Sequence, residues 1–332
     1  MASRNPAPDD TAAGLHGALP IDAAYNLPLR AAFAYYVDNL SQAEIAEKLQ
    51  VSRASVHNYL RQAQQEGIVR ISLDPGIAAR QELADRIADR FDLQAVYIVP
   101  SLAGEVRPSV FRAAAMWLGD LLEGVDSLGV AWGETVHEVA SLLPQRSRRD
   151  LHIVQLIGSM TLPFRFTAES CTALIADRFG ADCFNFHAPA VLSDPALVSA
   201  LCAEPILADH LVRMAKCDAA LFAIGLSTVD SHIVQCGVAT EQELAIYQED
   251  GAAAVIAGRF IDANGVPISG PLNGRVIGID LDRLRAISKR IVVSAGPERV
   301  EALRAALVGG FATHLVTDER TAACLVGEGT AA

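Results

Sequence analysis

The chain has 332 residues, of which 51% are hydrophobic and 20% charged, and its 27 basic and 39 acidic residues give a formal net charge of −12. This length and composition can bury a large core and suit about two domains. The acidic balance argues against a protein that binds nucleic acid through a generally basic surface, so any DNA contact has to come from a small local region.

The start of the chain and its cysteines point to an ordinary cytoplasmic protein. No basic segment is followed by an apolar core, and no run of eighteen apolar residues occurs, so neither a signal peptide nor a membrane span is predicted. Residues 1–26 are expected to be a disordered tail. The six cysteines have no C-x-x-C spacing and no histidines at metal-ligand spacing, so they predict no metal, cofactor or disulfide and are interpreted as small buried residues.

Three short helices are predicted within residues 27–74. The first covers residues 27–40, and its larger apolar side chains are expected to pack on the other two: Phe33, Tyr36, Val37 and Leu40. Ser41 and Glu44 form a capping box, in which each side chain accepts a hydrogen bond from the other residue's backbone N–H, and this box opens the second helix. The apolar stripe of that helix consists of Ile45, Ala46 and Leu49.

The third helix is expected to begin after Ser52, which caps it, and to bury Val56 and Leu60 against the second helix across a turn at Gln50-Val51. Such a pair is typical of the helix-turn-helix motif, whose second helix enters the major groove of DNA. Its outer face is polar and can contact base edges or phosphates. The predicted DNA-binding residues are Ser41, Gln42, Ser52, Arg53, Ala54, Ser55, His57, Asn58 and Arg61.

Glu66-Gly67 predicts a glycine C-cap, and the alternating residues 68–73 predict a short strand that would form a wing. A capped helical pair with a polar face also occurs in bundles that contact no nucleic acid. Residues 27–74 are neutral overall, because Arg30, Lys48, Arg53, Arg61 and Arg70 are matched by Asp38, Glu44, Glu47, Glu66 and Asp74. One such head should bind DNA weakly, so a dimer or tetramer with several heads on one operator is predicted.

Several segments carry a family resemblance. QAEIAEKL, VSRASVHNYL and AQQEGIVRISL resemble the DNA-binding domain of the SorC family of bacterial, sugar-responsive transcriptional regulators. ADRIADRFDLQAVYIVP, LGVAWGETV, CDAALFAIGLST, GRFIDANG, NGRVIGIDLDRL and HLVTDERTAACLV follow the order and approximate spacing of the effector-binding domain of that family. The resemblance covers residues 27–328. It implies operator DNA and a small sugar, polyol or sugar phosphate as partners.

Residues 75–332 are predicted to form the effector-binding and oligomerisation domain. Apolar strand patterns alternate with amphipathic helices, as in an α/β domain with a largely parallel sheet. Strands buried on both faces are predicted at 95–99, 127–131, 152–156, 219–224 and 291–294, and helices at 110–123 and 297–307. The resemblance implies a Rossmann-like fold similar to the sugar isomerase, glucosamine-phosphate deaminase and CoA-transferase group. Ligands of such sheets bind at the carboxyl ends of the strands.

Glycines that follow three of these strands suggest anion-binding turns, each between a strand and a helix. Gly133 is the strongest candidate, because a glycine lets backbone N–H groups approach an anion and the next helix adds its positive end. Taken alone, the turn at Gly133 is better explained as an ordinary connection between a strand and a helix. The repetition of such turns along one edge of the sheet is what favours a cleft. The predicted effector-binding residues are Gly133, Glu134, Thr135, Gly158, Ser159, Gly225, Leu226, Ser227 and Arg299.

The sequence departs from the SorC family at two ligand motifs. The family uses an acid in a G-A-x-G-D segment and a lysine in a G-x-x-K segment. Here residues 251–255 read GAAAV, without an acid, and residues 296–299 read GPER, so that Arg299 stands in place of the lysine. Arginine keeps the positive charge and can bind a phosphate or carboxylate through two contacts, so an anionic or polyhydroxylated effector remains the expected class.

For Arg259 and Arg275 an anion-binding and a structural role are both open. The other polar motifs are interpreted as structural: a hairpin turn at 262–265, an N-cap at Thr317-Asp318, and the isolated histidines His137, His152 and His187.

A sugar-phosphate isomerase or deaminase is the competing interpretation of the fold. Acid–base catalysis requires a carboxylate or histidine in the cleft, and the predicted turns supply only Glu134, whose place at a helix start the helix dipole explains. A protein-interaction module built on the helical head would leave the cleft unexplained. The sequence therefore predicts a cytoplasmic, effector-controlled DNA-binding regulator and not an enzyme.

Overall fold

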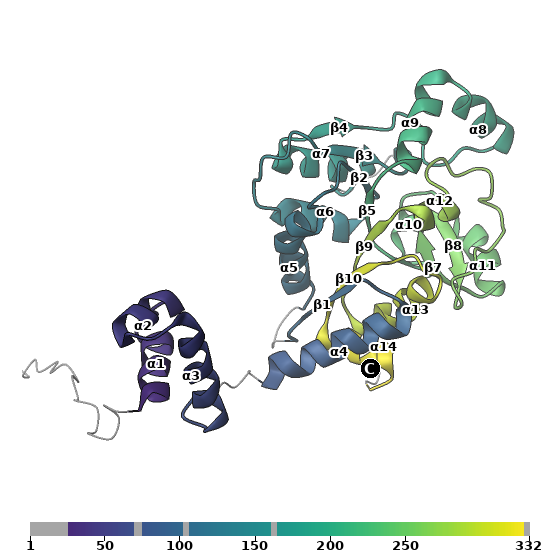
Figure 1. Ribbon diagram of the computed structural model, residues 1–332. Helices are drawn as coiled ribbons and strands as arrows, with labels where there is room; N and C mark the ends of the chain where they lie inside the picture. Colours follow the sequence, from purple (N-terminus) through teal and green to yellow (C-terminus); the bar gives the residue numbers. More distant parts are fainter. Residues whose placement is uncertain (1–25, 70–74, 102–105, 161–164, 329–332) are drawn as a thin grey trace, which may run out of the picture. The chain divides into compact units, whose positions relative to one another are not determined.

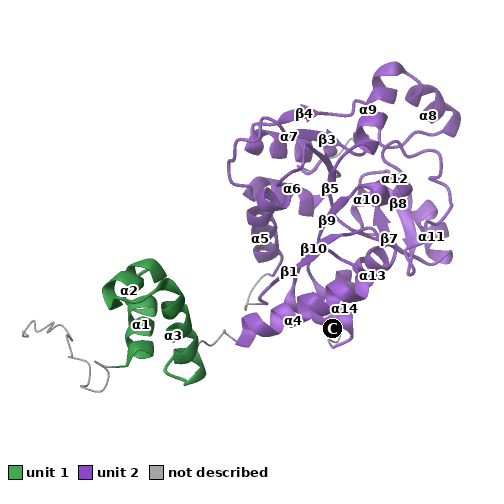
Figure 2. Cartoon of the chain, in the orientation of Figure 1, with its two compact units in different colours: residues 1–74 green, residues 75–332 purple. Residues whose placement is uncertain are grey.

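The computed structural model describes residues 26–69, 75–101, 106–160 and 165–328 (Figure 1). The chain divides into two compact units, residues 1–74 and 75–332 (Figure 2). All but the last residue of the predicted tail, 1–26, lies outside the described residues.

The first unit, called the head, contains helices α1 (Leu27–Tyr36), α2 (Gln42–Leu49) and α3 (Arg53–Gln65). The capping box is confirmed: the Ser41 N–H donates to Oε2 of Glu44 at 2.8 Å, and the Glu44 N–H donates to Oγ of Ser41 at 3.3 Å. The cap of α3 is confirmed as well, since Oγ of Ser52 accepts the Ser55 N–H at 3.0 Å. Gln50, at φ +56°, ends α2 in the left-handed conformation.

The contribution of α1 to the head's core differs from the prediction. Helix α1 ends at Tyr36, and the side chains of Phe33, Tyr36 and Val37 are 41%, 40% and 60% exposed. Only Leu40, of the four predicted residues, packs partly on the core. The alanines of α1 let it approach α2 and α3 closely, which turns its bulky side chains outward. The buried residues are Ala31, Ala32, Ala34, Ile45, Val56, Leu60 and Ala63.

The end of α3 agrees with the prediction, but the described residues do not show the predicted wing. Gly67 has φ +72°, and the Val69 N–H donates to the carbonyl of Ala63 at 3.0 Å, so the chain folds back on α3. Ile68 and Val69 are not in a strand, and the rest of the predicted strand, 70–73, lies outside the described residues.

The second unit is built on a seven-stranded sheet in the order β1-β10-β9-β5-β2-β3-β4, in which every neighbouring pair is parallel. The five predicted strands are present, with ends shifted by at most two residues, and the predicted α/β fold class is confirmed. The strands are β1 (Ala95–Val99), β2 (Ser127–Val130), β3 (His152–Gln155), β4 (Asp182–Phe184), β5 (Ala219–Phe222), β9 (Lys289–Val293) and β10 (His314–Asp318).

Helices cover both faces of this sheet (Figure 1). One face carries α5 (Val106–Leu121), α6 (Glu134–Leu142) and α7 (Ala168–Phe179), and the other carries α4 (Pro75–Phe91), α9 (Pro205–Ala215), α13 (Val300–Val308) and α14 (Glu319–Val326). In β5, Ala219 and Leu221 pack on the first face, whereas Ala220 and Phe222 pack on the second. Burial on both faces explains why the strands read as unbroken apolar runs.

A second, antiparallel sheet has the order β6-β7-β8. Its strands are β6 (Gly225–Leu226), β7 (Ala252–Ile256) and β8 (Arg259–Asp262), and the remaining helices are α8 (Pro195–Cys202), α10 (His232–Gln235), α11 (Glu241–Glu249), α12 (Leu281–Ala286) and the 3₁₀ helix η2 (Pro297–Arg299). The hairpin turn after β8 is confirmed: Oδ1 of Asp262 accepts the N–H groups of Asn264 and Val266, and Gly265 has φ +74°.

Among the described residues, no single helix is long and apolar enough to cross a membrane. Helices α8 and α9 reach that length and apolar composition only as a pair, and the pair is bent by 90°. No group of three or more His, Cys, Asp or Glu in the described ranges can hold a metal ion. The expectation of buried cysteines holds for Cys171, Cys217 and Cys324, holds in part for Cys202 and Cys236, and is wrong for Cys183, which is exposed in the three-residue edge strand β4.

Candidate DNA-reading helix and effector cavity

Helix α3 presents a polar face opposite its buried side. Arg53, His57 and Arg61 are exposed at four-residue spacing, and Ala54 and Asn58 are exposed beside them. Val56 and Leu60 on the other side of the helix are buried in the core. The arrangement can place the five exposed side chains in a major groove.

The other predicted DNA-binding residues lie at helix starts. Oγ of Ser52 and Oγ of Ser55 are 2.9 Å apart, and Ser41 serves the capping box, so these hydroxyls hold the helix ends in shape. Gln42 is half-buried at the first position of α2. Helix N-termini of this kind can also donate backbone N–H groups to DNA phosphates.

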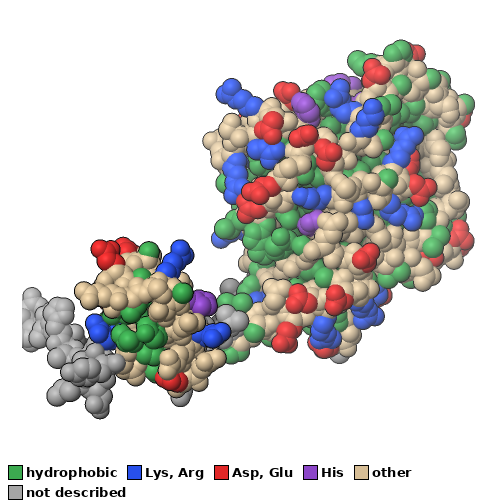
Figure 3. All heavy atoms as spheres, viewed as in Figure 1, with side chains coloured by type: hydrophobic (Ala, Val, Ile, Leu, Met, Phe, Trp, Pro, Cys, Tyr) green, Lys and Arg blue, Asp and Glu red, His purple; other side chains and the backbone are tan. Residues whose placement is uncertain are grey.

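On the surface that Figure 3 shows, basic and acidic side chains are interspersed over both units rather than gathered in one field. This agrees with the neutral charge counted for the head and with the net charge of −12.

A cavity of about 320 Å³, called here the effector cavity, lies at the carboxyl ends of β2 and β5. In the sheet β3 adjoins β2 on one side and β5 adjoins it on the other, so the cavity lies where the strand order reverses, the usual ligand position in such folds. Its wall consists of Ala131, Trp132, Gly133, Glu134, Thr135, Ala223, Ile224, Gly225, Leu226, Thr228, Asp230, Ser231, His232, Ile233, Val255, Ala257, Gly258 and Arg299.

The start of α6 forms one side of the effector cavity. Gly133 is the N-cap residue, with φ +130° and ψ 161°, and no side chain caps the helix. Only glycine adopts this backbone region readily, which explains why a glycine occupies position 133. Glu134 and Thr135 follow as the first two residues of α6, so the helix offers its first N–H groups and its positive end to the cavity.

Arg299 reaches the effector cavity from the segment that follows β9. Its Nη1 donates to the carbonyl of Ile224, which follows β5, at 3.2 Å. Its Nε is buried without a hydrogen-bond partner in the described structure and lies 3.7 Å from Oε1 of Glu298. Burial lowers the pKa of Arg299, but a guanidinium keeps its charge in proteins at neutral pH in spite of such a shift. A cation with spare donors therefore borders the cavity.

Glu134 is held by an arginine from a different helix. Nη2 of Arg107, in α5, donates to Oε2 of Glu134 at 2.8 Å. Burial alone would raise the pKa of Glu134, but the hydrogen bond and positive charge of Arg107 outweigh it and hold that pKa below its ordinary value. Glu134 is therefore ionised at neutral pH.

The segment after β6 supplies polar and aromatic groups that the sequence analysis missed. Oγ of Ser231 is buried and has no hydrogen-bond partner among the described residues, although Ser231 lines the cavity. His232 lies 4.7 Å from Phe166 between ring centroids, and Phe166 stacks 6.5 Å from Trp132. Burial and the nearby arginines lower the pKa of His232 despite the opposing charge of Glu134, so it is largely neutral at pH 7.

Not all of the predicted turns contribute to the effector cavity. Gly133, Glu134, Thr135, Gly225, Leu226 and Arg299 line it, whereas Gly158, Ser159 and Ser227 do not. The expected turn between strand and helix at Gly158-Ser159 was wrong, because the chain stays extended: Ser159 pairs with Pro189, and a Cβ on Gly158 would lie 2.3 Å from the Pro189 carbonyl oxygen. Gly225 and Leu226 also differ from the expected turn before a helix, because they form the strand β6.

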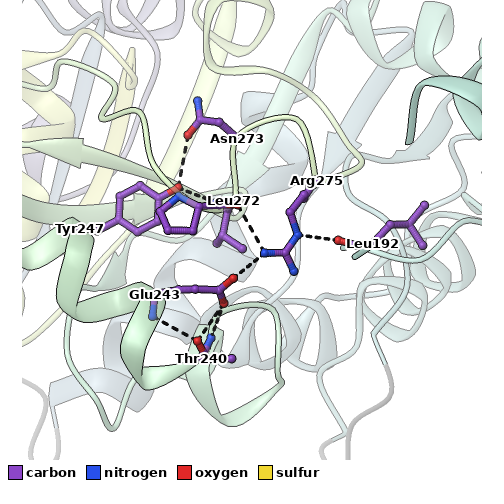
Figure 4. A network of polar contacts seen from close by, with 8 residues as sticks. Leu192, Thr240, Glu243, Tyr247, Leu272, Asn273 and Arg275 are labelled. Carbon is purple, nitrogen blue, oxygen red and sulfur yellow. Dashed lines mark hydrogen bonds and ion pairs between the residues drawn. The ribbon is translucent and has the colours of Figure 1, made fainter. Parts of the chain in front are cut away.

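Arg275 is explained by structural contacts (Figure 4). Its Nη1 pairs with Oε1 of Glu243 at 2.5 Å, and its Nε donates to the carbonyl of Leu192 at 2.8 Å. Glu243 also accepts the Thr240 N–H at 2.8 Å in a second capping box, so the pair ties the start of α11 to the segment before α12. The structural interpretation of Arg275 therefore stands.

Arg259 is not part of the effector-cavity wall and lines a second cavity of about 210 Å³, which shares Gly258 with the first. Its Nη1 donates to the carbonyl of Ala257 at 3.2 Å and its Nη2 to that of Gly278 at 3.5 Å, which joins the turn between β7 and β8 to the segment before α12. Asp318 is the N-cap of α14, as predicted, and is almost fully buried. The histidines interpreted as structural, His137, His152 and His187, also lie outside the effector-cavity wall.

Residues missed by the sequence analysis divide into two kinds. Thr228, Asp230, Ser231 and His232 follow a predicted strand closely, so their polar run was a usable signal. Arg107 carried no such signal, because only the packing of α5 beside α6 brings it to Glu134.

Two family models match the chain. The one described as "Putative sugar-binding domain" matches residues 77–327. The one described as "Sigma-70, region 4" matches residues 28–65, which cover the helices of the head except for the first residue of α1.

Individual relatives match along most of their length. The uncharacterized transcriptional regulator YjhU of Escherichia coli K12 is 34% identical over 306 residues, covering 90% of this chain and 93% of the relative. The deoxyribonucleoside regulator of Bacillus subtilis is 28% identical, covering 91% and 97%. The full-length sorbitol operon regulator SorC from Klebsiella pneumoniae superimposes with a TM-score of 0.71 at 25% identity, covering 90% of this chain and 98% of that one.

Proposed function

This chain belongs to the SorC family of transcriptional regulators, whose sugar-binding domain it carries over residues 77–327, and on that premise we propose how its two units work. The head binds operator DNA through the exposed face of α3. A small polyhydroxylated metabolite binds in the effector cavity and changes the affinity of the protein for that DNA.

The observation that carries the effector proposal is the composition of the cavity wall. The uncapped start of α6 and the guanidinium of Arg299 suit an anionic or strongly polar group. Buried donors and acceptors such as Oγ of Ser231 suit hydroxyls, and the ring of Trp132 suits the apolar C–H face of a sugar. A sugar, polyol or sugar phosphate combines these features. Relatives bear names that refer to a deoxyribonucleoside, to erythritol catabolism and to a sorbitol operon, which agrees with that class.

Control of DNA binding requires two arrangements of the protein with different affinities for the metabolite, since a ligand indifferent to them shifts nothing. The neutral head supplies little phosphate-neutralising charge, so the proposal includes a dimer or tetramer that places several heads on one operator. Because its target is the cell's own DNA, the protein acts in the cytoplasm.

A non-catalytic role suits Glu134, the carboxylate at the start of α6. General acid–base catalysis works best with a group whose pKa lies near the operating pH. Glu134 has a lowered pKa and is paired with Arg107, which suits a fixed acceptor better than a proton donor. Incubation with aldose and ketose phosphates, followed by product analysis, tests this part, and turnover would overturn it.

The effector proposal is tested by thermal melts with sugars, polyols and their phosphates, since a tight ligand raises the melting temperature by mass action. Hits are measured by isothermal titration, and operator binding is then measured with and without the hit. The hit should bind with a fixed stoichiometry at a single kind of site, and its binding should change the affinity of the protein for the operator. A ligand that binds without changing operator affinity would overturn the proposed control.

A further inference from the structure

An ion pair borders the start of α6 in the effector cavity. Glu134 lines the cavity and accepts a hydrogen bond from Arg107 at 2.8 Å. Arg107 comes from α5 and is not part of the cavity wall. The side chain of Arg107 is 35% exposed and that of Glu134 is 40% exposed, so the pair lies at the edge of the protein's interior. A residue outside the cavity thus acts on a charge at its wall.

The charge of Glu134 conflicts with the rest of the wall around it. The first N–H groups of α6 have no side-chain cap and favour an anion, and Arg299 adds a positive charge. An unpaired carboxylate on the first residue of the same helix would repel that anion, because like charges a few ångströms apart interact strongly where water is partly excluded. Pairing with Arg107 removes this conflict.

We propose that Arg107 is a positioning residue that sets effector selectivity: by cancelling the charge of Glu134, it lets the cavity accept a sugar or polyol that carries an anionic group. The inference rests on the proposed function, in which this cavity binds a carbohydrate-type effector. A carboxylate has about four acceptor positions, so Glu134 can still receive ligand hydroxyls while it is bound to Arg107.

The test uses matched pairs of neutral and phosphorylated probes: ribose with ribose 5-phosphate, erythritol with erythritol 4-phosphate, and sorbitol with sorbitol 6-phosphate. The dissociation constant of each probe is measured by isothermal titration on the full chain. The readout is the preference of each variant for the phosphorylated over the neutral member of a pair. This ratio cancels any general loss of cavity shape.

Arg107→Gln should lower the preference for the phosphorylated probe by roughly tenfold or more, because Glu134 then loses its hydrogen-bonded positive partner. Arg107→Gln combined with Glu134→Gln should restore the ratio to within about threefold of wild type, since the repelling charge is gone. Arg107→Lys keeps the charge and should retain most of the preference. Arg112→Gln, at an exposed arginine of the same helix, is the matched control and should leave the ratio unchanged.

The outcomes separate this inference from the proposed function. An Arg107→Gln ratio equal to wild type, or a double variant that stays as unselective as Arg107→Gln, overturns the role of Arg107 while the effector cavity stands. Binding of neutral probes alone by the wild type also overturns it. If the wild type binds no member of any pair, the proposed effector class itself fails. Should Arg107→Gln melt at a much lower temperature, the comparison of Arg107→Lys with wild type still decides, because Arg107→Lys keeps the positive charge beside Glu134 and a lost preference in that variant overturns the role.

Discussion

Replacement of Gly133 gives the sharpest test of the start of α6, because two substitutions should rank oppositely in stability and in effector binding. The aspartate variant should be more stable than the alanine variant but should bind the effector more weakly. The residue lies at φ +130° and ψ 161°, a backbone region that is essentially restricted to glycine. A Cβ built on it meets no atom within 4 Å. Gly133→Ala and Gly133→Asp therefore share a cost in backbone strain, and the Cβ atom of each meets no steric clash.

The magnitudes follow from that geometry. Strain in this region costs roughly 1–3 kcal/mol of unfolding free energy in both variants. Aspartate at an N-cap position stabilises a helix by about 0.5–2 kcal/mol relative to alanine, so Gly133→Asp should be the more stable of the two. Its carboxylate would lie about 4 Å from an anion bound at the helix start, and at an effective dielectric constant of about 20 this repulsion amounts to about 4 kcal/mol, or roughly a thousandfold in affinity.

Urea denaturation and isothermal titration with the metabolite found by the melt screen measure the two effects on the same samples. Operator binding without metabolite should stay at the wild-type level, because the head is a separate compact unit. Gly124→Ala and Gly124→Asp are matched controls, since Gly124 has φ +70°, an open Cβ position and no place in the cavity wall. If Gly133→Asp binds the metabolite within tenfold of Gly133→Ala, the start of α6 does not hold an anionic group.

Three further predictions follow from the contacts described above. Arg53→Ala or Arg61→Ala should weaken operator binding by roughly 1–3 kcal/mol in a binding titration without shifting the thermal melt, and unchanged affinity for both would place the DNA-reading surface elsewhere. Arg299→Ala should weaken an anionic effector by roughly 1.5–3 kcal/mol in calorimetry, whereas a silent variant would favour a neutral polyol. Burial alone would raise the pKa of Glu243, but hydrogen bonds from Thr240 and Arg275 outweigh it and lower that pKa. The stabilisation that this carboxylate contributes is therefore complete above its unfolded pKa of about 4.3, and it is lost as the pH falls through the lower pKa of the folded state. As the pH is lowered from about 5, the unfolding free energy of Glu243→Gln in denaturation curves should therefore fall less than that of the wild type. An equal fall in the two proteins would contradict the assigned contact.

Local patterns in the sequence determined the elements whose structure depends on neighbouring residues. The capping box of Ser41 and Glu44, the cap at Ser52 and the hairpin turn at Asp262 are each made within a few residues, so side-chain chemistry alone specifies them. The strands of the parallel sheet were also predictable, because burial on both faces imposes an uninterrupted apolar run. The family membership likewise follows from segments spread along the chain.

Only the tertiary structure decided which groups meet. Phe33 and Val37 read as core residues, yet they are exposed, because the choice of buried face on α1 depends on how closely its alanines approach the other helices. Gly158 has the same local context as Gly133, but it packs against the backbone at Pro189 instead of opening a helix. The pair of Arg107 with Glu134 joins residues 27 positions apart on two helices, and sequence periodicity holds no information on such a contact because it arises from the packing of α5 beside α6 over the shared face of the sheet.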